Sequence, residues 1–491
     1  MNDRPAFPVQ SLVRAARERA LDPGSRGELD DALRRLSEPL RVAIAGRVKA
    51  GKSTLLNALL AEELAATDAG ECTALVTWYR YGPVARAVVV LRTGERRSRP
   101  VAREGGAVEV DLGAPVEEVD HVEVHWPSSR LRDVTYLDTP GIASLSTEVS
   151  ARTEAALAAG DRPAVADCVI YLLRHAHARD VAFLEAFHQE DLARGTPLNT
   201  VGVLSRADEI GSSRTDALEV AGRVATRYQH DRRLHRLCPV VVPVAGLLGQ
   251  AGVSLREEEF RMVARLAAQP AAVTDELLLT AERVGGSDAV LPVTPLERSH
   301  LLERLGLFGL RLAVRTVRAG DAGSALDLSA ELVRRSGLDR LRAVLHTQFA
   351  ERSQLLRARS ALETVRVVLD RGGCEDAAAL AAGCEEITAA AHEFTEVRLL
   401  DRLREGTLGL SGQQAAEMER LLGGWGHGAA CRLGLPADAD PERIRREALA
   451  ALTRWQRLAE SPLTDRAAAV AARSVARSCE GVLSALAAGR G

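Results

Sequence analysis

Lysine is almost missing from this chain: of its 64 basic side chains, only Lys49 and Lys52 are lysines. An excess of charge is missing too, because 67 acidic residues leave a net charge of −3. The chain therefore has no long-range attraction to nucleic acid or anionic lipid, and we expect no nucleic-acid partner. No uninterrupted apolar run reaches the roughly 18 residues that a membrane-spanning helix needs, so any contact with membrane lipid is expected to be peripheral.

Paired or clustered cysteines are missing as well. The seven cysteines are scattered, odd in number and without C-x-x-C spacing, which argues against a disulfide framework or a zinc site. The first residues are polar and contain proline, and they lack the basic and then apolar pattern of a secretory signal. We therefore expect reduced thiols and a cytoplasmic protein, with a peripheral position on the inner face of the cell membrane as the alternative.

Short β-rich runs begin at Arg41 and alternate with helical stretches. This interleaving predicts an α/β domain with a mainly parallel sheet and helices on both faces. The runs are RVAIAG, ALVTWYRYG, RAVVVLRTG, HVEVHW, RDVTYLD, DCVIYLLR, NTVGVLSR and CPVVVPVAG.

Helix-forming residues dominate after about residue 250. Residues 338–370 and 375–404 read as two helices of about 45–50 Å each, at 1.5 Å per residue, separated by Arg371-Gly372-Gly373. Such an antiparallel hairpin predicts an elongated all-α neck or stalk. We expect N-terminal helices over 1–40 that join this neck, an α/β domain with a helical extension over 41–337, and the neck over 338–491.

Both lysines lie in one motif. Residues 46–53 read G-x-x-x-x-G-K-S after an apolar strand and before a helix, the context that a phosphate-binding P-loop requires. Glycines let backbone N–H groups surround the phosphates, Lys52 neutralises the β- and γ-phosphate oxygens, and Ser53 gives its hydroxyl to Mg²⁺. Arginine at position 52 would be too large and forked for this role. The predicted phosphate-binding residues are Gly46, Arg47, Val48, Lys49, Ala50, Gly51, Lys52, Ser53 and Thr54.

A second motif, Asp138-Thr-Pro-Gly141, follows an apolar strand. In isolation this sequence also suits a type I turn. Behind a P-loop, however, an acidic residue is needed to hold Mg²⁺ through water, and the Gly141 amide would face the γ-phosphate. We therefore predict that Asp138 and Gly141 sense the phosphates.

A third motif, Ser205-Arg206-Ala207-Asp208, ends another strand at the edge of the sheet where a base would lie. Asp208 can accept hydrogen bonds from guanine N1 and N2, and Arg206 can stack on the ring. Adenine lacks that pair of donors, so the motif predicts GTP and GDP as substrate and product. An exposed loop end without function is the alternative.

The three motifs match, in order, the G1, G3 and G4 motifs of translation-factor-type GTPases, with S-R-A-D in place of the usual [NT]-K-x-D. More narrowly, the chain resembles bacterial dynamin-like proteins, most closely the actinobacterial isoniazid-inducible IniA/IniC group and its IniC type. This resemblance implies a Mg²⁺-dependent, dynamin-type GTPase domain over 41–337. The segments that carry it are KAGKSTLLNALL, ECTALVTWYRYG, LDTPG, SRADEIG, VVPVAGLL, LERLGLFGLR and CRLGLP.

The resemblance also assigns residues that lie outside these three motifs. In this family a switch I threonine completes the Mg²⁺ shell, and Thr73 is favoured over Thr77, which also suits a buried strand. The G5 loop, whose backbone amide touches guanine O6, falls at Val244-Ala245-Gly246, and Ala245 and Gly246 are its candidate contacts. The metal site would then consist of Ser53, Thr73 and Asp138.

Catalysis needs a group that stabilises developing charge. Val48 stands where eukaryotic dynamins carry a water-positioning glutamine, and valine cannot do this. Guanylate-binding proteins, which are dynamin relatives, place an internal arginine finger at the position of Lys49. Two interpretations of Lys49 stay open: a finger of this kind, or a solvated lysine that only raises phosphate affinity. The candidate catalytic residues are Lys49, Lys52, Ser53 and Thr73.

The resemblance further implies dimerisation through the GTPase face, with a second copy or another dynamin-like protein, and movement of the stalk. It also implies membrane remodelling or envelope maintenance, although the hairpin tip at 371–375 is polar. Two alternatives are a GTP-dependent assembly partner of a membrane-binding dynamin-like protein, and a slow regulatory GTPase switch.

Two further segments have simpler interpretations. His175 and His177 lack a third ligand and are expected in a solvated loop rather than at a metal. The glycine-rich segment around Trp425 is either a hinge between helices or an exposed aromatic tip.

Overall fold

A computed structural model provides the structure of the protein. It describes residues 6–65, 75–104, 107–139, 166–174, 200–211, 213–286, 291–350, 352–404 and 406–487. Thr73, Gly141, His175 and His177, which the sequence singled out, lie outside these described residues.

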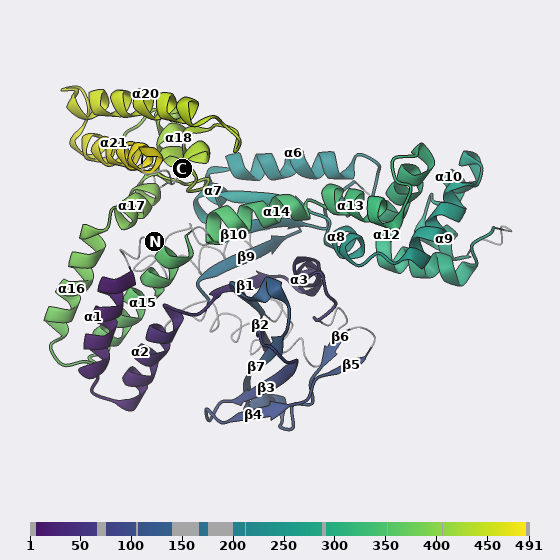
Figure 1. The fold of residues 1–491 in the computed structure, drawn as a ribbon, viewed down its shortest axis with the longest axis horizontal. Helices are drawn as coiled ribbons and strands as arrows, with labels where there is room; N and C mark the ends of the chain where they lie inside the picture. The colour runs from purple at the N-terminus through teal and green to yellow at the C-terminus, as the bar shows by residue number, and fades with distance from the viewer. Residues whose placement is uncertain are drawn as a thin grey trace.

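One sheet forms the centre of the molecule, and nine strands of the described residues belong to it. Its order is β11-β10-β9-β1-β8-β2-β7-β3-β4 (Figure 1). The first five strands in this order are mutually parallel, as the alternation of strands and helices predicts. These five are β11 (Val240–Val244), β10 (Thr200–Ser205), β9 (Cys168–Leu173), β1 (Leu40–Gly46) and β8 (Val134–Asp138).

The other half of the sheet is mostly antiparallel. Strand β2 is antiparallel to β8 but parallel to β7, and β3 and β4 continue the sheet as antiparallel neighbours. A separate hairpin consists of β5 and β6. These strands are β2 (Val76–Tyr81), β3 (Arg86–Leu91), β4 (Arg96–Arg99), β5 (Ala102–Glu104), β6 (Ala107–Glu109) and β7 (Val119–Trp126).

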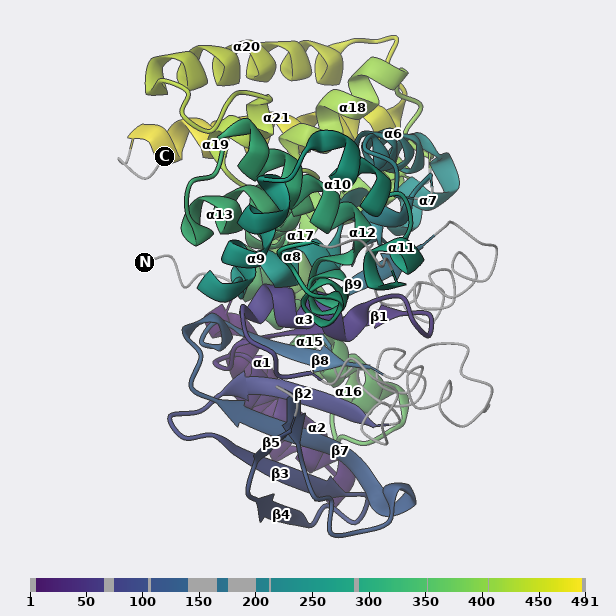
Figure 2. The same cartoon turned by 90° about the vertical axis from the view of Figure 1, so that its right-hand side faces the viewer.

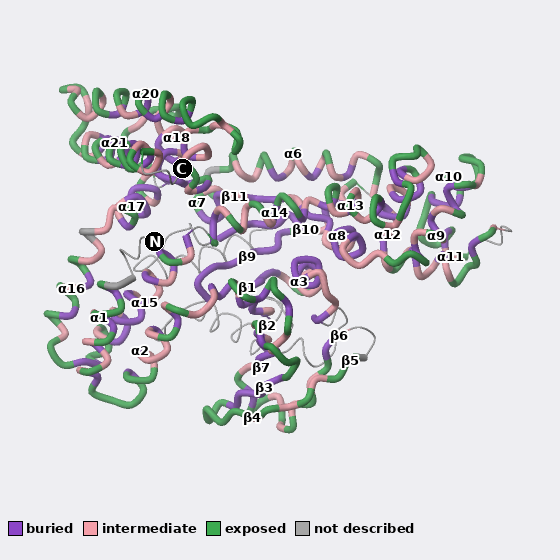
Figure 3. Tube along the Cα trace, in the orientation of Figure 1, coloured by how far each residue is buried: buried purple, intermediate pink, exposed green. Residues whose placement is uncertain are grey.

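Helices cover both faces of the sheet because each strand points alternate side chains to opposite sides. In β1, Val42 shares a buried cluster with Leu56, whereas Ala43 shares another with Ala221. The central strands are accordingly buried (Figure 3). The first cluster is covered by α3 (Lys52–Leu60) and α14 (Leu338–Leu345), and the second by α6 (Ala217–His230) and α7 (Arg232–Leu237).

A group of helices is inserted between β11 and α14. It has a buried core of its own, which includes Leu248, Val263 and Leu305. The chain leaves and returns at the same place, since the Ala245 amide donates to the Ser336 carbonyl at 2.9 Å. The helices are α8 (Gly246–Val253), α9 (Glu257–Ala267), α10 (Ala271–Leu277), α11 (Ala281–Gly286), α12 (Pro295–Ala319) and α13 (Ala325–Ser336).

A second helical group lies on the other side of the sheet from this insert and combines N-terminal helices with helices from residues 353–404 (Figure 1). Val13 near the N-terminus shares a buried cluster with Leu29 and with the distant Val365. The helices are α1 (Ala6–Glu18), α2 (Pro23–Arg35), α15 (Ser353–Asp370), α16 (Ala377–Ala390) and α17 (His392–Arg404).

The long hairpin expected over 338–404 is interrupted in both arms. The first arm contains a π-helical turn, His346–Ala350, between α14 and α15. The chain changes direction there because α14 packs on the sheet, whereas α15 packs on α1 and α2. The second arm is broken at Ala391, whose φ of −80° and ψ of 118° are not helical. Neither arm is therefore one continuous helix.

The chain ends in a helical hairpin at the opposite end of the molecule from β4 (Figures 1 and 2). Trp425 lies between two shorter helices and is 50% exposed, while Gly423 has a φ of 79°. The segment is therefore both a turn and an exposed aromatic site. Among the described helices, none combines enough length with enough apolar character for a membrane crossing. The four helices are α18 (Gly412–Leu421), α19 (Ala429–Leu433), α20 (Pro441–Glu460) and α21 (Arg466–Ala487).

Candidate nucleotide-binding site

The P-loop connects the end of β1 to the start of α3. Gly46 and Gly51 have φ values of 151° and 92°, and a Cβ on Gly46 would lie 2.9 Å from the Leu172 carbonyl oxygen of the neighbouring strand. Gly51 caps α3 without a side-chain hydrogen bond. The backbone N–H groups of the first turn are thus directed at the space where an anion binds at a helix N-terminus.

Lys52 lies inside the curve of this loop. Its Nζ donates to the carbonyl oxygens of Gly46 and Arg47, each at 3.3 Å. Burial lowers the pKa of Lys52, while the nearby Asp138 carboxylate opposes that shift. The ammonium group is therefore partly desolvated and close to an acid, the setting in which it interacts strongly with a phosphate.

Ser53 and Asp138 face each other across the ends of α3 and β8. Ser53 Oγ donates to Asp138 Oδ2 at 3.2 Å. Asp138 Oδ1 is buried and has no hydrogen-bond partner among the described residues. Burial raises the pKa of Asp138 to about 6, although Lys52 and Ser53 act in the opposite direction.

A cation fits this pair. A buried carboxylate oxygen without a donor is costly, and Mg²⁺ favours carboxylate and hydroxyl oxygen ligands. The predicted metal residues Ser53 and Asp138 are therefore brought together, while Thr73 lies outside the described residues.

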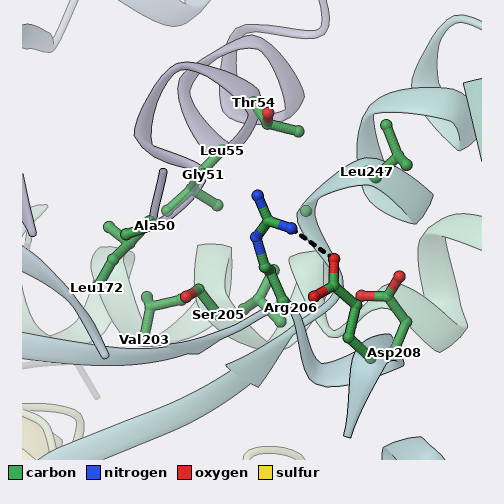
Figure 4. A pocket seen from close by; sticks show the side chains of 13 residues that line it. Ala50, Gly51, Thr54, Leu55, Leu172, Val203, Ser205, Arg206, Asp208 and Leu247 are labelled. Carbon is green, nitrogen blue, oxygen red and sulfur yellow. Dashed lines mark hydrogen bonds and ion pairs between the residues drawn. The ribbon is translucent and has the colours of Figure 1, made fainter. Parts of the chain in front are cut away.

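A pocket of about 180 Å³ lies beside the P-loop (Figure 4). It is formed by the P-loop and α3 on one side and by the ends of β9, β10 and β11 on the other. The sequence motifs predicted eight of its residues and missed Leu55, Leu172, Val203, Glu209 and Leu247. The lining residues are Ala50, Gly51, Thr54, Leu55, Leu172, Val203, Ser205, Arg206, Asp208, Glu209, Val244, Gly246 and Leu247.

The missed residues come from two kinds of position. Leu172 and Val203 lie near the carboxyl ends of parallel strands, where ligand sites of α/β folds occur, so strand alignment could have indicated them. Leu247 follows Gly246 on α8, and no local signal marks it.

Asp208 follows β10 in a short 3-10 turn and is only 7% exposed. Burial, with a smaller contribution from the adjacent Glu209, raises the pKa of Asp208 to about 6. Arg206 projects into the pocket near Asp208, and its Nη1 donates to Glu209 Oε1 at 2.6 Å (Figure 4). The arginine therefore has an acidic partner that keeps it beside the space for a base.

The two G5 residues differ in their surroundings. The Ala245 amide already donates to the Ser336 carbonyl, and Ala245 does not line the pocket. Gly246 does line it, at the first residue of α8. Of the two, Gly246 is therefore the better placed to meet a base oxygen.

Val48 and Lys49 lie on the exposed side of the P-loop. Val48 is 49% exposed, and Lys49 is exposed with a φ of 61°. Few residues other than glycine adopt such a φ, and they concentrate at functional sites. This conformation directs attention to Lys49, but it does not by itself distinguish a finger from a solvated lysine.

Several known proteins are similar to this chain. A family model described as 50S ribosome-binding GTPase matches residues 41–201. The isoniazid-induced protein IniC of Mycobacterium tuberculosis is 40% identical over 460 residues, which cover 93% of this chain and 92% of that protein. A bacterial dynamin-like protein of Nostoc punctiforme is 25% identical over 192 residues, which cover 37% of this chain and 26% of that protein.

A solved structure of an oligomerised bacterial dynamin pair aligns with 98% of this chain, and the alignment covers 73% of the chain in that structure. The sequence identity is 13% and the TM-score is 0.34. That score is too low to support an argument about architecture. The IniC alignment, by contrast, spans nearly all of both chains, and it confirms the resemblance inferred from the motifs. This chain belongs to the IniC family of bacterial dynamin-like GTPases.

Proposed function

We propose that this protein hydrolyses GTP to GDP and phosphate in the pocket between the P-loop and Asp208. The observation that carries the proposal is that residues for the two ends of the nucleotide line one pocket: Ala50, Gly51 and Thr54 for the phosphates, and Asp208 and Gly246 for the base.

The phosphates are bound by backbone N–H groups of residues 46–54 and by Lys52. Ser53, Asp138 and Thr73 would hold Mg²⁺, and the bound ion would supply charge neutralisation for the phosphates. The Gly141 amide contacts the γ-phosphate. Water then attacks the γ-phosphate in line, and GDP is the leaving group.

Asp208 selects guanine by accepting from N1 and N2 in its ionised form. Arg206 stacks on the ring, and the Gly246 amide donates to O6. Burial of Asp208 favours the complex with guanine, because hydrogen bonds to a carboxylate are stronger in a desolvated site.

Lys49 serves as the internal finger that stabilises charge on the transferred phosphoryl group. Its exposed position and left-handed backbone in the phosphate-binding loop are compatible with this role as well as with a solvated lysine. The competing role, a solvated lysine that improves only phosphate affinity, is separated from the first by measuring kcat and affinity independently.

The GTPase face also serves as the dimer interface, with a second copy or another dynamin-like protein. Exposed Val48 and Lys49 on this face support the proposal. Hydrolysis would then move the helical group formed by α1, α2 and α15–α17, in membrane remodelling or envelope maintenance at the inner face of the membrane.

The test is magnesium-dependent GTP turnover, measured against protein concentration, with and without liposomes. Turnover per molecule should rise with concentration, and Lys52→Ala should abolish it. The protein should not hydrolyse ATP, and it should bind GDP more tightly than ADP. Absence of any preference for guanine nucleotides would overturn the proposal. Turnover that does not rise with concentration would favour a slow switch, and failure to float with liposomes would favour an assembly partner.

A further inference from the structure

Helix α12 is not one regular helix, because its backbone leaves the helical region at Gly306. The φ of 66° and ψ of 171° at this residue lie in a region that is essentially restricted to glycine. The deviation occurs in the middle of a helix of 25 residues, and it therefore changes the direction of the second half.

Gly306 lies directly behind the base end of the pocket. A Cβ at this position would be 3.3 Å from Leu247 Cδ2 and 4.0 Å from Asp208 Oδ2. Leu247 and Asp208 both line the pocket. The absence of a side chain at 306 thus allows α12 to pack against the two residues that would surround a base.

Arg304 anchors α12 just before the kink. Its Nε donates to Glu259 Oε1 at 2.9 Å, and its Nη1 donates to Glu63 Oε1 at 2.8 Å. Its Nη2 donates to Ser254 Oγ at 2.7 Å. The first half of α12 is therefore joined to α8, α9 and the segment after α3.

Arg311 anchors the second half. Its three guanidinium nitrogens each donate to a backbone oxygen at 2.7 Å, those of Ser213, Leu278 and Leu279. Ser213 belongs to the segment that follows Asp208. Burial lowers the pKa of Arg311. A straight α12 would carry Arg311 away from these acceptors.

We propose that Gly306 is a positioning residue for guanine recognition. Its left-handed backbone lets α12 pack behind Leu247 and Asp208, and this packing holds the Asp208 carboxylate at the depth where it meets guanine N1 and N2. Fixing an acceptor in a desolvated position strengthens its hydrogen bonds and removes the need to reorganise on binding. The inference rests on the proposed function, since it assumes that the pocket takes a guanine nucleotide.

The test compares Gly306→Ala with Gly320→Ala in the full chain. Gly320 ends the same helix with a similar φ of 81°, and no atom lies within 4 Å of a Cβ there. Affinities are measured for GDP and for IDP, which lacks the 2-amino group. Wild type should prefer GDP by about tenfold or more, because a hydrogen bond to a charged group contributes roughly 1.5–3 kcal/mol.

Gly306→Ala should reduce the GDP to IDP preference about threefold or more, while Gly320→Ala keeps it. A folded Gly306→Ala protein with an unchanged preference would overturn the inference. If wild type binds neither nucleotide, the proposed function itself fails, so the two failures are distinguishable.

Should Gly306→Ala fail to fold, Arg311→Gln decides the matter. This variant removes hydrogen bonds that hold the second half of α12, and it introduces no clash at the kink. It should reduce the preference for GDP over IDP. Arg315→Gln, at an exposed position further along the helix, is the matched control and should not. An Arg311→Gln protein with the wild-type preference would overturn the inference.

Discussion

Ser53 Oγ donates to one oxygen of Asp138 at 3.2 Å, while the other oxygen of that buried carboxylate has no partner among the described residues. The two residues are 85 positions apart in the chain, and the parallel pairing of β1 with β8 brings them together. A bound cation stabilises a buried carboxylate that has a hydrogen bond to only one of its oxygens. Metal binding and the pH dependence of protein stability should therefore both depend on Asp138.

Replacing Ser53 should selectively weaken the binding of Mg²⁺. We expect Ser53→Ala to raise the Mg²⁺ concentration needed for half-maximal GTPase activity by roughly 10- to 100-fold, as for other groups that orient a metal. Ser53→Thr keeps the hydroxyl and is the control. A magnesium titration of turnover measures both, and identical curves for the alanine and threonine variants would contradict the assignment.

The stability of the nucleotide-free protein should depend on Asp138 in a direction set by its pKa. The folded pKa of about 6 lies above the ordinary 3.8, so the stabilising contribution of this group is fully present below the ordinary pKa. That contribution is lost as the pH rises through the folded pKa. At about pH 7.5 we expect Asp138→Asn to raise the free energy of unfolding by on the order of 2–3 kcal/mol.

Denaturant unfolding in EDTA checks this expectation at about pH 5 and about pH 7.5. The difference between Asp138→Asn and wild type should be smaller at the lower pH, where the folded protein already carries the proton. The same variant should lose magnesium-dependent binding of GTP. A wild-type protein that is more stable than the variant at the higher pH would contradict the assignment.

Base selection should change when Asp208 becomes an amide. Asn offers one acceptor and one donor edge, so it no longer matches the two donors of guanine but does match N1–H and the C2 carbonyl of xanthine. We expect Asp208→Asn to weaken GDP binding by about 2–3 kcal/mol and to strengthen XDP binding. Calorimetry with both nucleotides measures this, and parallel losses for the two would indicate damage to the pocket rather than altered recognition.

Lys49→Ala separates the two roles of that lysine. As an internal finger, Lys49 should contribute to kcat by about 10²-fold or more, since comparable fingers supply ~10³ to 10⁵, while GTP affinity changes little. Val84→Ala, at an exposed valine outside the nucleotide site, is the control and should leave kcat nearly unchanged. A variant that keeps kcat and loses only affinity would show that Lys49 is a solvated phosphate contact.

Asp167 should be essential for joining the helical group to the sheet. Its carboxylate pairs with Arg35 of α2, with both side chains at most 5% exposed. It also accepts at 2.9 Å from the Arg41 amide of β1 and from Ser360 Oγ of α15. We expect Asp167→Ala to lower the free energy of unfolding by about 3–5 kcal/mol, because Arg35 stays buried without its carboxylate.

The exposed pair Arg17–Asp30, which joins α1 to α2, provides the control for this experiment. Both of its side chains are more than 40% exposed, so Asp30→Ala should change stability by less than about 1 kcal/mol. Denaturant unfolding measures both variants. Equal effects would mean that Asp167 does not hold the two parts of the molecule together.

The chemistry of the site was determined by the sequence itself, because its signals are local. The P-loop is one unbroken segment whose glycine and lysine positions are dictated by phosphate geometry, and the strand that precedes it is visible as the apolar run RVAIAG. Asp138 ends one such run and Asp208 follows another, and each of the eight β-rich runs contributes a strand to the central sheet. Ends of parallel strands meet at one edge, so these residues were expected near the phosphate loop.

Only the tertiary structure decided the arrangements that depend on distant contacts. No glycine or proline marks the break at Ala391 or the π-helical turn before α15. Local propensity therefore predicted two continuous helices. The Ala245 amide is taken by Ser336, a residue that is 91 positions away and returns to the same sheet edge only in the folded chain. No local sequence signal distinguishes Gly306 from other helix glycines, because its role depends on α12 passing behind Asp208. Such features arise from packing between segments far apart in the sequence, and no local pattern of side chains encodes them.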